Sequence, residues 1–203
     1  MCQNVNAAYA IGRAKTIRCD SMHQIIIGYV GVIAYEQQCL KLMHLVEQDS
    51  RFCFYLFGNE PEDKKLSNYL REHPCSRIKM FGPYQPAQKV DIMSGIDILF
   101  NAYGHGNELL DYSLSNKLYD SFYMRIPLLT SPNTAMSEEA GSFSFDIDLE
   151  KVDDLDGLFD WYRALDWEAF DGYSEKYLKR VFREQDLFYA RLRQVLEGKQ
   201  TSE

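Results

Sequence analysis

Several signatures of common enzyme and membrane-protein classes are missing from this 203-residue sequence. No run of about 18 apolar residues occurs, so no segment predicts a membrane-spanning helix. The sequence has neither a Gly-x-Gly-x-x-Gly fingerprint nor a Walker lysine motif, which argues against a dehydrogenase and a P-loop ATPase. No Gly-x-Ser-x-Gly elbow occurs, which argues against a serine hydrolase.

Cysteines and histidines are few and widely spaced. There are five cysteines without a Cys-x-x-Cys pair, and four scattered histidines. This spacing predicts no metal site, and we expect no bound metal or cofactor. Free thiols are typical of a reducing compartment, so we expect a cytoplasmic protein.

Positive charge is also in short supply. The chain has 22 Lys and Arg against 30 Asp and Glu, a formal net charge of -8 with histidine neutral. Nucleic-acid-binding domains usually present a basic face, so this balance argues against a nucleic-acid partner. Hydrophobic residues make up 46% of the chain, enough to build a sizeable core.

Short apolar runs alternate with amphipathic stretches along most of the chain. The runs typical of buried strands are 25–30, 52–57, 78–81, 96–100, 127–130 and 143–147. Helical patterns fall between them, at 35–48, 61–73, 85–94 and 116–124. Repeated strand-then-helix order predicts an α/β protein with a Rossmann-like doubly wound parallel sheet of about six strands.

Three segments differ in character. Residues 25–150 hold the predicted sheet. Residues 1–24 carry basic residues but no apolar stretch, so they are no secretory signal. We interpret them as a linker or the cut edge of something longer. Residues 151–203 predict C-terminal helices at 152–165 and 174–196, and the second carries a broad apolar stripe that needs a surface to cover.

The predicted strands end at candidate ligand-binding turns. In doubly wound sheets, ligands bind beyond the carboxyl ends of the strands. Gly31, Gly58 and Gly82 end three of the runs, and a loop over 101–115 follows the fourth. We therefore expect these turns to cluster, and a loop of this length is usually functional or mobile.

The most informative stretch is the start of the helix predicted from residue 116. Ser115 or Asn116 can cap it, and the free amides and positive dipole end of such a helix make an anion site. Lys117 adds positive charge there, and Asp120 one turn on can accept hydrogen bonds from ribose hydroxyls. The spacing equally describes an i, i+3 ion pair on a solvated helix surface, and that alternative stays open.

This stretch resembles the Pro-Asn-Lys-Leu-Tyr-Glu to Gly-Lys-Pro-Val-Ile segment of family 4 retaining glycosyltransferases, particularly those of bacterial capsule and O-antigen synthesis. The matching residues here are Ser115-Asn116-Lys117-Leu118-Tyr119-Asp120 and Arg125-Ile126-Pro127. Segments 27–31, 55–58, 78–84 and 95–99 resemble further strands and glycine turns of that family. The resemblance covers roughly residues 25–148.

The resemblance implies a two-domain GT-B enzyme, of which this chain holds only the donor-binding half. It implies that Gly31 and Lys117 face the donor diphosphate, that Asp120 binds the ribose, and that the Pro83-Tyr84 turn approaches the base. The full nucleotide-sugar-binding set is Gly31, Gly58, Pro83, Tyr84, Asp111, Ser115, Asn116, Lys117, Leu118 and Asp120. No catalytic residue is assigned, because the family's catalytic histidine belongs to the other domain.

The implied reaction is hexosyltransferase-like and metal-free. A sugar would pass from a nucleotide-diphosphate sugar to a glycan or lipid-linked acceptor with retention of its anomeric configuration. The chain would be inactive without the N-terminal domain. The full enzyme would be cytoplasmic, with a peripheral place at the inner face of the membrane as the alternative. In this family the final helix crosses back onto the N-terminal domain, which would account for the apolar stripe; a dimer through that helix is the alternative.

The sequence departs from the family at one position near the reacting centre. The first of the family's two glutamates falls on Tyr112, with Asp111 beside it as a candidate substitute. This favours an alternative, a non-catalytic nucleotide-binding or assembly module. A signalling receiver domain is a third interpretation, but acidic residues are missing after the first strand. We interpret His105 as a solvent-facing loop histidine and Glu138-Glu139 as a helix-start cap.

Overall fold

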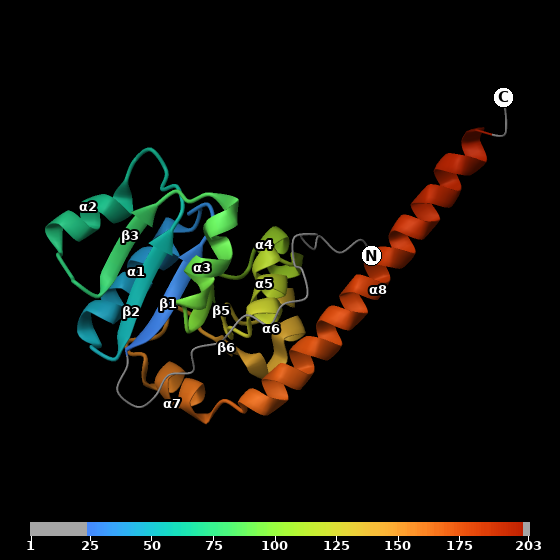
Figure 1. The fold of residues 1–203 in the computed structure, drawn as a ribbon. Helices are drawn as coiled ribbons and strands as arrows, with labels where there is room; N and C mark the ends of the chain where they lie inside the picture. Colours follow the sequence, from blue (N-terminus) through green and yellow to red (C-terminus); the bar gives the residue numbers. More distant parts are fainter. Residues whose placement is uncertain (1–23, 201–203) are drawn as a thin grey trace.

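The computed structural model describes residues 24–200, with side chains described through residue 196. Six strands form one fully parallel sheet in the order β3-β2-β1-β4-β5-β6 (Figure 1). The strands are β1 Ile25–Val30, β2 Phe52–Phe57, β3 Ile78–Gly82, β4 Ile98–Asn101, β5 Leu128–Thr130 and β6 Ser144–Asp146. The predicted Rossmann-like sheet of six strands is confirmed.

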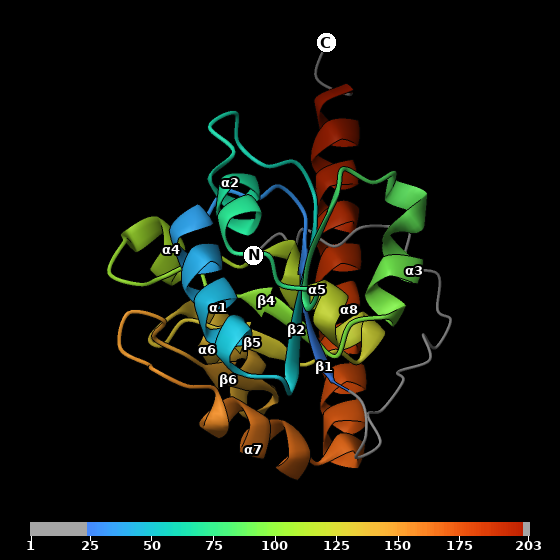
Figure 2. The ribbon, with the colours of Figure 1, turned by 90° about the vertical axis from the view of Figure 1, so that its left-hand side faces the viewer.

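Helices cover both faces of this sheet. They are α1 Glu36–Gln48, α2 Lys65–Glu72, α3 Lys89–Ser94, α4 Glu108–Tyr112, α5 Asn116–Met124, α6 Ala135–Ala140, α7 Asp156–Ala164 and α8 Trp167–Gln200, with 3-10 turns at Pro86–Gln88 and Gly141–Phe143. Figure 2 shows α1 on one side of the sheet and α3, α5 and α8 on the other. Within the described part of the chain, no helix has the length and apolar content needed to cross a bilayer.

Two hydrophobic cores result, one on each face. Side chains alternate between the two faces along each strand, so Ile98 and Phe100 join the core under α1 and α7, while Leu99 joins the core under α5 and α8. The C-terminal helices therefore share the cores of the sheet domain.

Several element boundaries differ from the sequence predictions. Helix α2 begins at Lys65, because residues 61–64 form a turn that ends with Lys64 in the left-handed region (φ 48°). The segment 101–115 is no continuous loop: it contains α4, whose first turn is capped by the Asn107 side chain accepting from the Leu109 amide at 2.9 Å. Helix α8 starts at Trp167, seven residues before the predicted 174.

Helix α6 was absent from the predictions, and Glu138-Glu139 do not cap its start. The cap is Thr134, whose side chain accepts from the Ser137 amide at 3.3 Å. Glu139 lies at the other end and pairs with Arg180 of α8 at 2.9 Å. This ion pair ties α8 to the sheet domain.

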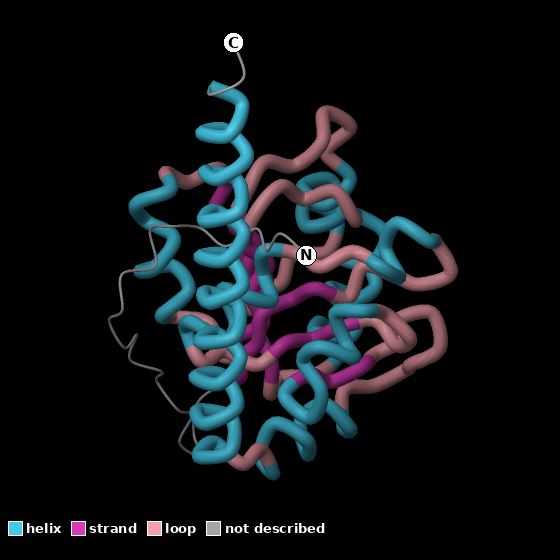
Figure 3. Tube along the Cα trace, turned by 90° about the vertical axis from the view of Figure 1, so that its right-hand side faces the viewer, coloured by secondary structure: helices cyan, strands magenta, loops and turns pink. Residues whose placement is uncertain are grey.

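Helix α8 has two halves in different surroundings. Phe170, Tyr177 and Val181 are buried in the core beside α5. Phe182 still packs against this core, and the C-terminal part of the helix then projects beyond the rest of the molecule (Figure 1 and Figure 3). The apolar side chains of that half are exposed: Leu187, Phe188, Tyr189, Leu192, Val195 and Leu196. The apolar stripe predicted from the sequence is thus covered over its first half only.

Because the two halves of α8 differ in burial, alanine substitutions at two of its phenylalanines should differ in their effect on stability. Phe170→Ala should lower the free energy of unfolding by about 3–5 kcal/mol, because it opens a cavity beside Phe122 and Phe143. Phe188→Ala, on the projecting half, should change it by less than about 0.5 kcal/mol. Urea unfolding followed by circular dichroism measures both, and equal losses would contradict the described packing of α8.

Candidate functional site

The carboxyl ends of the first three strands meet at closely spaced glycine turns. The Gly31 amide donates to the Phe57 carbonyl at 2.9 Å, and the Gly58 amide donates to the Gly82 carbonyl at 2.8 Å. Both Gly31 (φ 133°) and Gly58 (φ 151°) lie in backbone regions that favour glycine. A Cβ atom on Gly58 would lie 1.7 Å from the Gly31 carbonyl oxygen. The expected clustering of these turns is confirmed.

Lys117 lies at the start of α5 with its side chain almost fully buried, 6% exposed. Its ammonium lies 3.8 Å from the centre of the Tyr29 ring and donates a hydrogen bond to the Tyr103 hydroxyl. Cation–π contact compensates part of the lost hydration, yet burial still lowers the pKa of Lys117 to about 7. The surface ion pair with Asp120 is therefore excluded, because Lys117 is neither on the surface nor paired with Asp120.

Tyrosines from separate parts of the chain enclose this lysine. Tyr29 comes from β1, Tyr103 follows β4, and Tyr35 precedes α1. The rings of Tyr35 and Tyr103 stack with centroids 3.9 Å apart. Burial raises the pKa of Tyr29 to about 12 and that of Tyr103 well above its usual value. Both phenols are neutral at pH 7, so Tyr103 offers Lys117 a neutral acceptor.

Ser115 caps α5, as the sequence predicted: its hydroxyl accepts from the Lys117 amide at 3.3 Å. Asn116, the first residue of the helix, is exposed, whereas Leu118 is fully buried in the core under α5. Leu118 therefore packs the helix onto the sheet and does not face the crevice surface.

Asp120 is 2% exposed and pairs with a lysine that sequence reasoning missed. Its Oδ2 lies 2.5 Å from the ammonium of Lys89, the first residue of α3. Its Oδ1 is buried and has no hydrogen-bond partner among residues 24–200. Burial raises the pKa of Asp120 to about 7 and lowers that of Lys89, whereas their mutual attraction opposes both shifts.

The remaining predicted site residues lie on either side of this pair. Pro83 is exposed in the turn after β3, and Tyr84 is half-buried against the core under α5. Asp111 accepts two hydrogen bonds from the Gly106 amide, at 3.0 and 3.1 Å, and so closes the loop before α4. Tyr112 is 81% exposed. Asp111 therefore already has a structural role in the loop.

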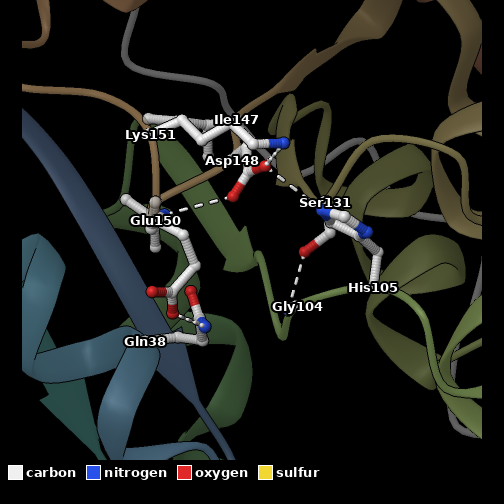
Figure 4. Close-up of a pocket in the computed structure, with 9 residues that line it drawn as sticks. Gln38, Gly104, His105, Ser131, Ile147, Asp148, Glu150 and Lys151 are labelled. Carbon is white, nitrogen blue, oxygen red and sulfur yellow. Dashed lines mark hydrogen bonds and ion pairs between the residues drawn. The ribbon is translucent and has the colours of Figure 1, made fainter.

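Two cavities share Gly104 and Ser131, and one of them is lined by Tyr103, the partner of Lys117. The smaller one, of about 160 Å³, is lined by Tyr35, Asn101, Tyr103, Gly104, Leu110, Ser113, Ser115, Ser131, Thr134 and Met136. The larger one, of about 300 Å³, is lined by Gln38, Gly104, His105, Ser131 and residues 147–151 (Figure 4).

The polar groups of the larger cavity are paired with one another. His105 is exposed, as expected, but its Nε2 lies 3.2 Å from Asp148, a partner 43 residues away that the sequence spacing gave no reason to expect. Lys151 lies 2.8 Å from the same carboxylate. The Gln38 amide donates to Glu150 at 3.1 Å. These contacts already satisfy most polar side chains of this cavity.

No metal centre is evident in the part of the chain that the structure describes, since no three His, Cys, Asp or Glu side chains gather closely enough to hold an ion. The charged side chains that α5 buries are Lys117 and Asp120, and Lys89 of α3 pairs with the latter.

Comparisons with known proteins find similarity in fold and none in sequence family. No protein-family model matches the sequence. No curated protein matches it either. Solved structures match by fold, and two of the three described next are named as glycosyltransferases.

Anabaena HepE, crystallised in complex with UDP, shares 10% identity at a TM-score of 0.62 over 85% of this chain and 49% of that one. A Rickettsia africae glycosyltransferase shares 12% identity at 0.62 over 91% and 50%. The catalytic domain of Helicobacter pylori cholesterol-alpha-glucosyltransferase shares 16% identity at 0.55 over 79% and 98%. The chain thus spans about half the length of the first two and nearly all of the third, and these likenesses show the fold.

The buried charges of the crevice predict a specific pH dependence of stability. The pKa of Lys117 falls from 10.5 to about 7 on folding, so unfolding takes up a proton above pH 7 and stability rises with pH there. The pKa of Asp120 rises from 3.8 to about 7, so stability falls as pH rises from 4 to 7. Above pH 7 the change in stability comes from Lys117 together with Lys89, whose pKa burial also lowers.

Lys117→Met should flatten the rise in stability between pH 7 and 8.5 and add about 1–4 kcal/mol at pH 7, because an apolar chain replaces a buried cation. Asp120→Asn is the matched control, and it should remove the fall in stability between pH 4 and 7. Urea unfolding across this range measures both. A Lys117→Met variant with the wild-type slope above pH 7 would show that Lys117 does not titrate in the folded protein.

Proposed function

We propose that this chain is the donor-binding domain of a glycosyltransferase and binds a nucleotide-diphosphate sugar in the crevice between β1 and β4. The observation that carries this proposal is the buried Lys117 ammonium at the start of α5, close to a buried carboxylate with one unpaired oxygen. These groups lie where the strand order reverses, which is where doubly wound sheets bind nucleotides.

The diphosphate would take the positive groups at the start of α5. A buried cation without a counterion is costly, and an anionic ligand would offset that cost. The dipole of α5 and the amides near Ser115 and Gly31 would add to the attraction. Because Tyr103 holds the Lys117 ammonium, a phosphate oxygen reaches Lys117 only when the Tyr103 ring moves aside.

The ribose and base would extend from there towards α3. Asp120 Oδ1 is the acceptor for a ribose hydroxyl, and Lys89 keeps the carboxylate in place. The turn at Pro83 and Tyr84, between β3 and α3, would approach the base. HepE, which has the same fold, was crystallised with UDP and with UDP and glucose, which supports this class of ligand.

The complete enzyme would transfer the sugar to a glycan or lipid-linked acceptor with retention of configuration, as in family 4. Lys117 and backbone amides would stabilise the leaving diphosphate without a metal ion. Turnover would need a second domain, since two of the similar structures are about twice the length that this chain spans. The enzyme would act in the cytoplasm.

The greater length of these two similar structures also supports a partner for the projecting half of α8, namely a second domain. Its apolar side chains are exposed on a helix that extends past the sheet (Figure 1). We propose that this half packs against the second domain, and that association of two copies of the isolated chain substitutes for it.

A second candidate, a nucleotide-binding or assembly module without turnover, is favoured by one observation. Tyr112 stands where the family has a glutamate and is exposed, while the neighbouring Asp111 carboxylate is held by Gly106. Both candidates predict diphosphate binding. An assay of sugar transfer by a protein that also contains the second domain separates them.

Thermal unfolding against uridine, guanosine, adenosine and cytidine diphosphates and their sugars tests the donor site. A ligand at 100 times its Kd adds about 2.7 kcal/mol, which for a domain of this size raises Tm by about 5–10 °C. Lys117→Ala should weaken binding of the stabilising diphosphate about 10-fold or more and leave its nucleoside unaffected.

Lys151→Ala is the matched control, because Lys151 is exposed and pairs with Asp148 beside the larger cavity. It should bind the diphosphate like wild type. Equal losses of diphosphate and nucleoside affinity in Lys117→Ala would contradict the diphosphate assignment. A protein that none of the diphosphates stabilises would contradict the proposed function.

Light scattering after size exclusion tests the projecting half of α8. The isolated chain should self-associate with rising concentration, and Leu192→Glu with Val195→Glu should return it to a folded monomer. Lys179→Glu, on the exposed side of the buried half, should leave association unchanged. A wild-type chain that stays monomeric at high concentration would rule out the dimer.

A further inference from the structure

The Lys117 ammonium is shut off from ligands in this structure. The residue is 6% exposed, and its ammonium lies 3.8 Å and 4.8 Å from the centres of the Tyr29 and Tyr103 rings. Tyr35 and Tyr103 line the smaller cavity, whereas Lys117 does not. Because the Tyr103 hydroxyl also accepts a hydrogen bond from the ammonium, Tyr103 separates Lys117 from that cavity. An anion can reach Lys117 only after the crevice changes shape.

The three tyrosines around Lys117 differ in how firmly they are held. Tyr29 is 1% exposed and belongs to the core under α1. Its hydroxyl donates to the Val32 carbonyl at 2.8 Å, which ties it to the loop after β1. Tyr35 and Tyr103 are half-buried and lie outside the strands and helices, after β1 and after β4. These two rings can turn outward without leaving a fully buried position.

Tyr35 and Tyr103 form one unit on a loop that can rotate. Their rings stack with centroids 3.9 Å and planes 16° apart. Tyr103 is followed by Gly104 (φ 97°) and Gly106 (φ 83°), both in the region that favours glycine. The Gly104 amide donates to the Ser131 hydroxyl at 2.8 Å and holds the present arrangement. Loop positions of this kind absorb the backbone rotations of moving segments.

An anion changes the balance between a closed and an open arrangement. In the closed one, the acceptor for the Lys117 ammonium is the neutral Tyr103 phenol. In the open one, the ammonium is free to bind a phosphate oxygen, whose negative charge attracts it more strongly than a phenol does. A ligand that binds only the open arrangement shifts the population towards it.

We propose that the stacked pair of Tyr35 and Tyr103 is a gate, which closes over Lys117 in the unliganded domain and opens for a phosphate anion. The closed gate weakens the apparent affinity in proportion to the fraction of molecules that are open. The inference rests on the proposed function, because it takes a diphosphate as the anion. The movement of the gate itself can be measured without any ligand.

Reductive methylation of the unliganded chain, followed by mass spectrometry of its peptides, measures that movement. Wild-type Lys117 should react at least about 10-fold more slowly than Lys179, whose side chain is 81% exposed. Tyr103→Phe should raise the Lys117 rate about 10-fold, because the closed gate loses a hydrogen bond to a charged group. Tyr35→Ala should raise it about 3-fold or more, because the stack is lost.

Tyr69→Phe is the matched control. Its hydroxyl also bonds to a charged side chain, donating to Glu47 at 2.9 Å, but it lies between α2 and α1 (Figure 1). The Lys117 rate should stay at the wild-type value in this variant. Low concentrations of urea separate gate opening from unfolding, because opening exposes little surface and should respond weakly. A Lys117 rate that rises steeply with urea would mean that labelling requires unfolding, and would contradict the gate.

Titration and stopped-flow binding test the link to the anion. The probes are inorganic pyrophosphate, which carries no base, and the diphosphates of uridine, guanosine, adenosine and cytidine. Tyr103→Phe should bind the probes that wild type binds about 10-fold more tightly, mainly through faster association, because more molecules are open. Bound pyrophosphate should also slow the methylation of Lys117. A Tyr103 hydroxyl that contributed directly to binding would instead make this variant weaker.

The two experiments separate the gate from the proposed function. Unchanged Lys117 labelling in both tyrosine variants, or wild-type labelling as fast as that of Lys179, would overturn the gate whether or not the chain binds a diphosphate. Weaker binding of the probes by Tyr103→Phe would overturn it as well. Faster labelling in the variants, with no probe bound by wild type or variants, would overturn the proposed function and the anion as the cause of opening.

Discussion

The burial of the Lys117 ammonium against tyrosine rings is the constraint on which the crevice depends. The cation needs the Tyr29 ring from β1, the Tyr103 hydroxyl after β4 and the start of α5 in one place. A buried amine keeps its proton poorly unless such partners surround it. The contact therefore links the two strands between which the sheet order reverses. It also determines where an anionic ligand would have the most favourable electrostatic interaction.

Asp120 and Lys89 form the second charged element of the crevice, one helical turn further along α5. Their ion pair joins α5 to α3 and leaves one carboxylate oxygen unpaired. Lys117 and Asp120 both have pKa values of about 7. Because the pKa of Lys117 is near 7, a bound phosphate that favours its protonated form would couple binding to proton uptake.

Helix α8 shows how one continuous apolar stripe meets two environments. Its first half completes the core under α5, held by the ion pair between Arg180 and Glu139. Its second half also carries apolar side chains but extends beyond the sheet, where the described chain offers them no surface. The helix is continuous because helical hydrogen bonds are local, whereas burial depends on what lies opposite.

The sequence by itself determined the features that depend on neighbours along the chain. Strand and helix periods predicted the six-stranded sheet, and Ser115 was one of the two caps predicted for α5. Glycines at strand ends gave the clustered turns. Where local signals competed, they misled: Pro61 begins a turn before α2, and α4 interrupts the segment taken as a loop.

Only the tertiary structure decided which side chains meet. The spacing of Lys117 and Asp120 described a surface ion pair as well as a binding site. The fold buried both and gave each a different partner, Tyr103 and Lys89. His105 and Asp148, 43 residues apart, likewise meet only because their strands end at the same edge of the sheet. Such contacts follow from strand order, which places distant residues together and leaves no local pattern in the sequence.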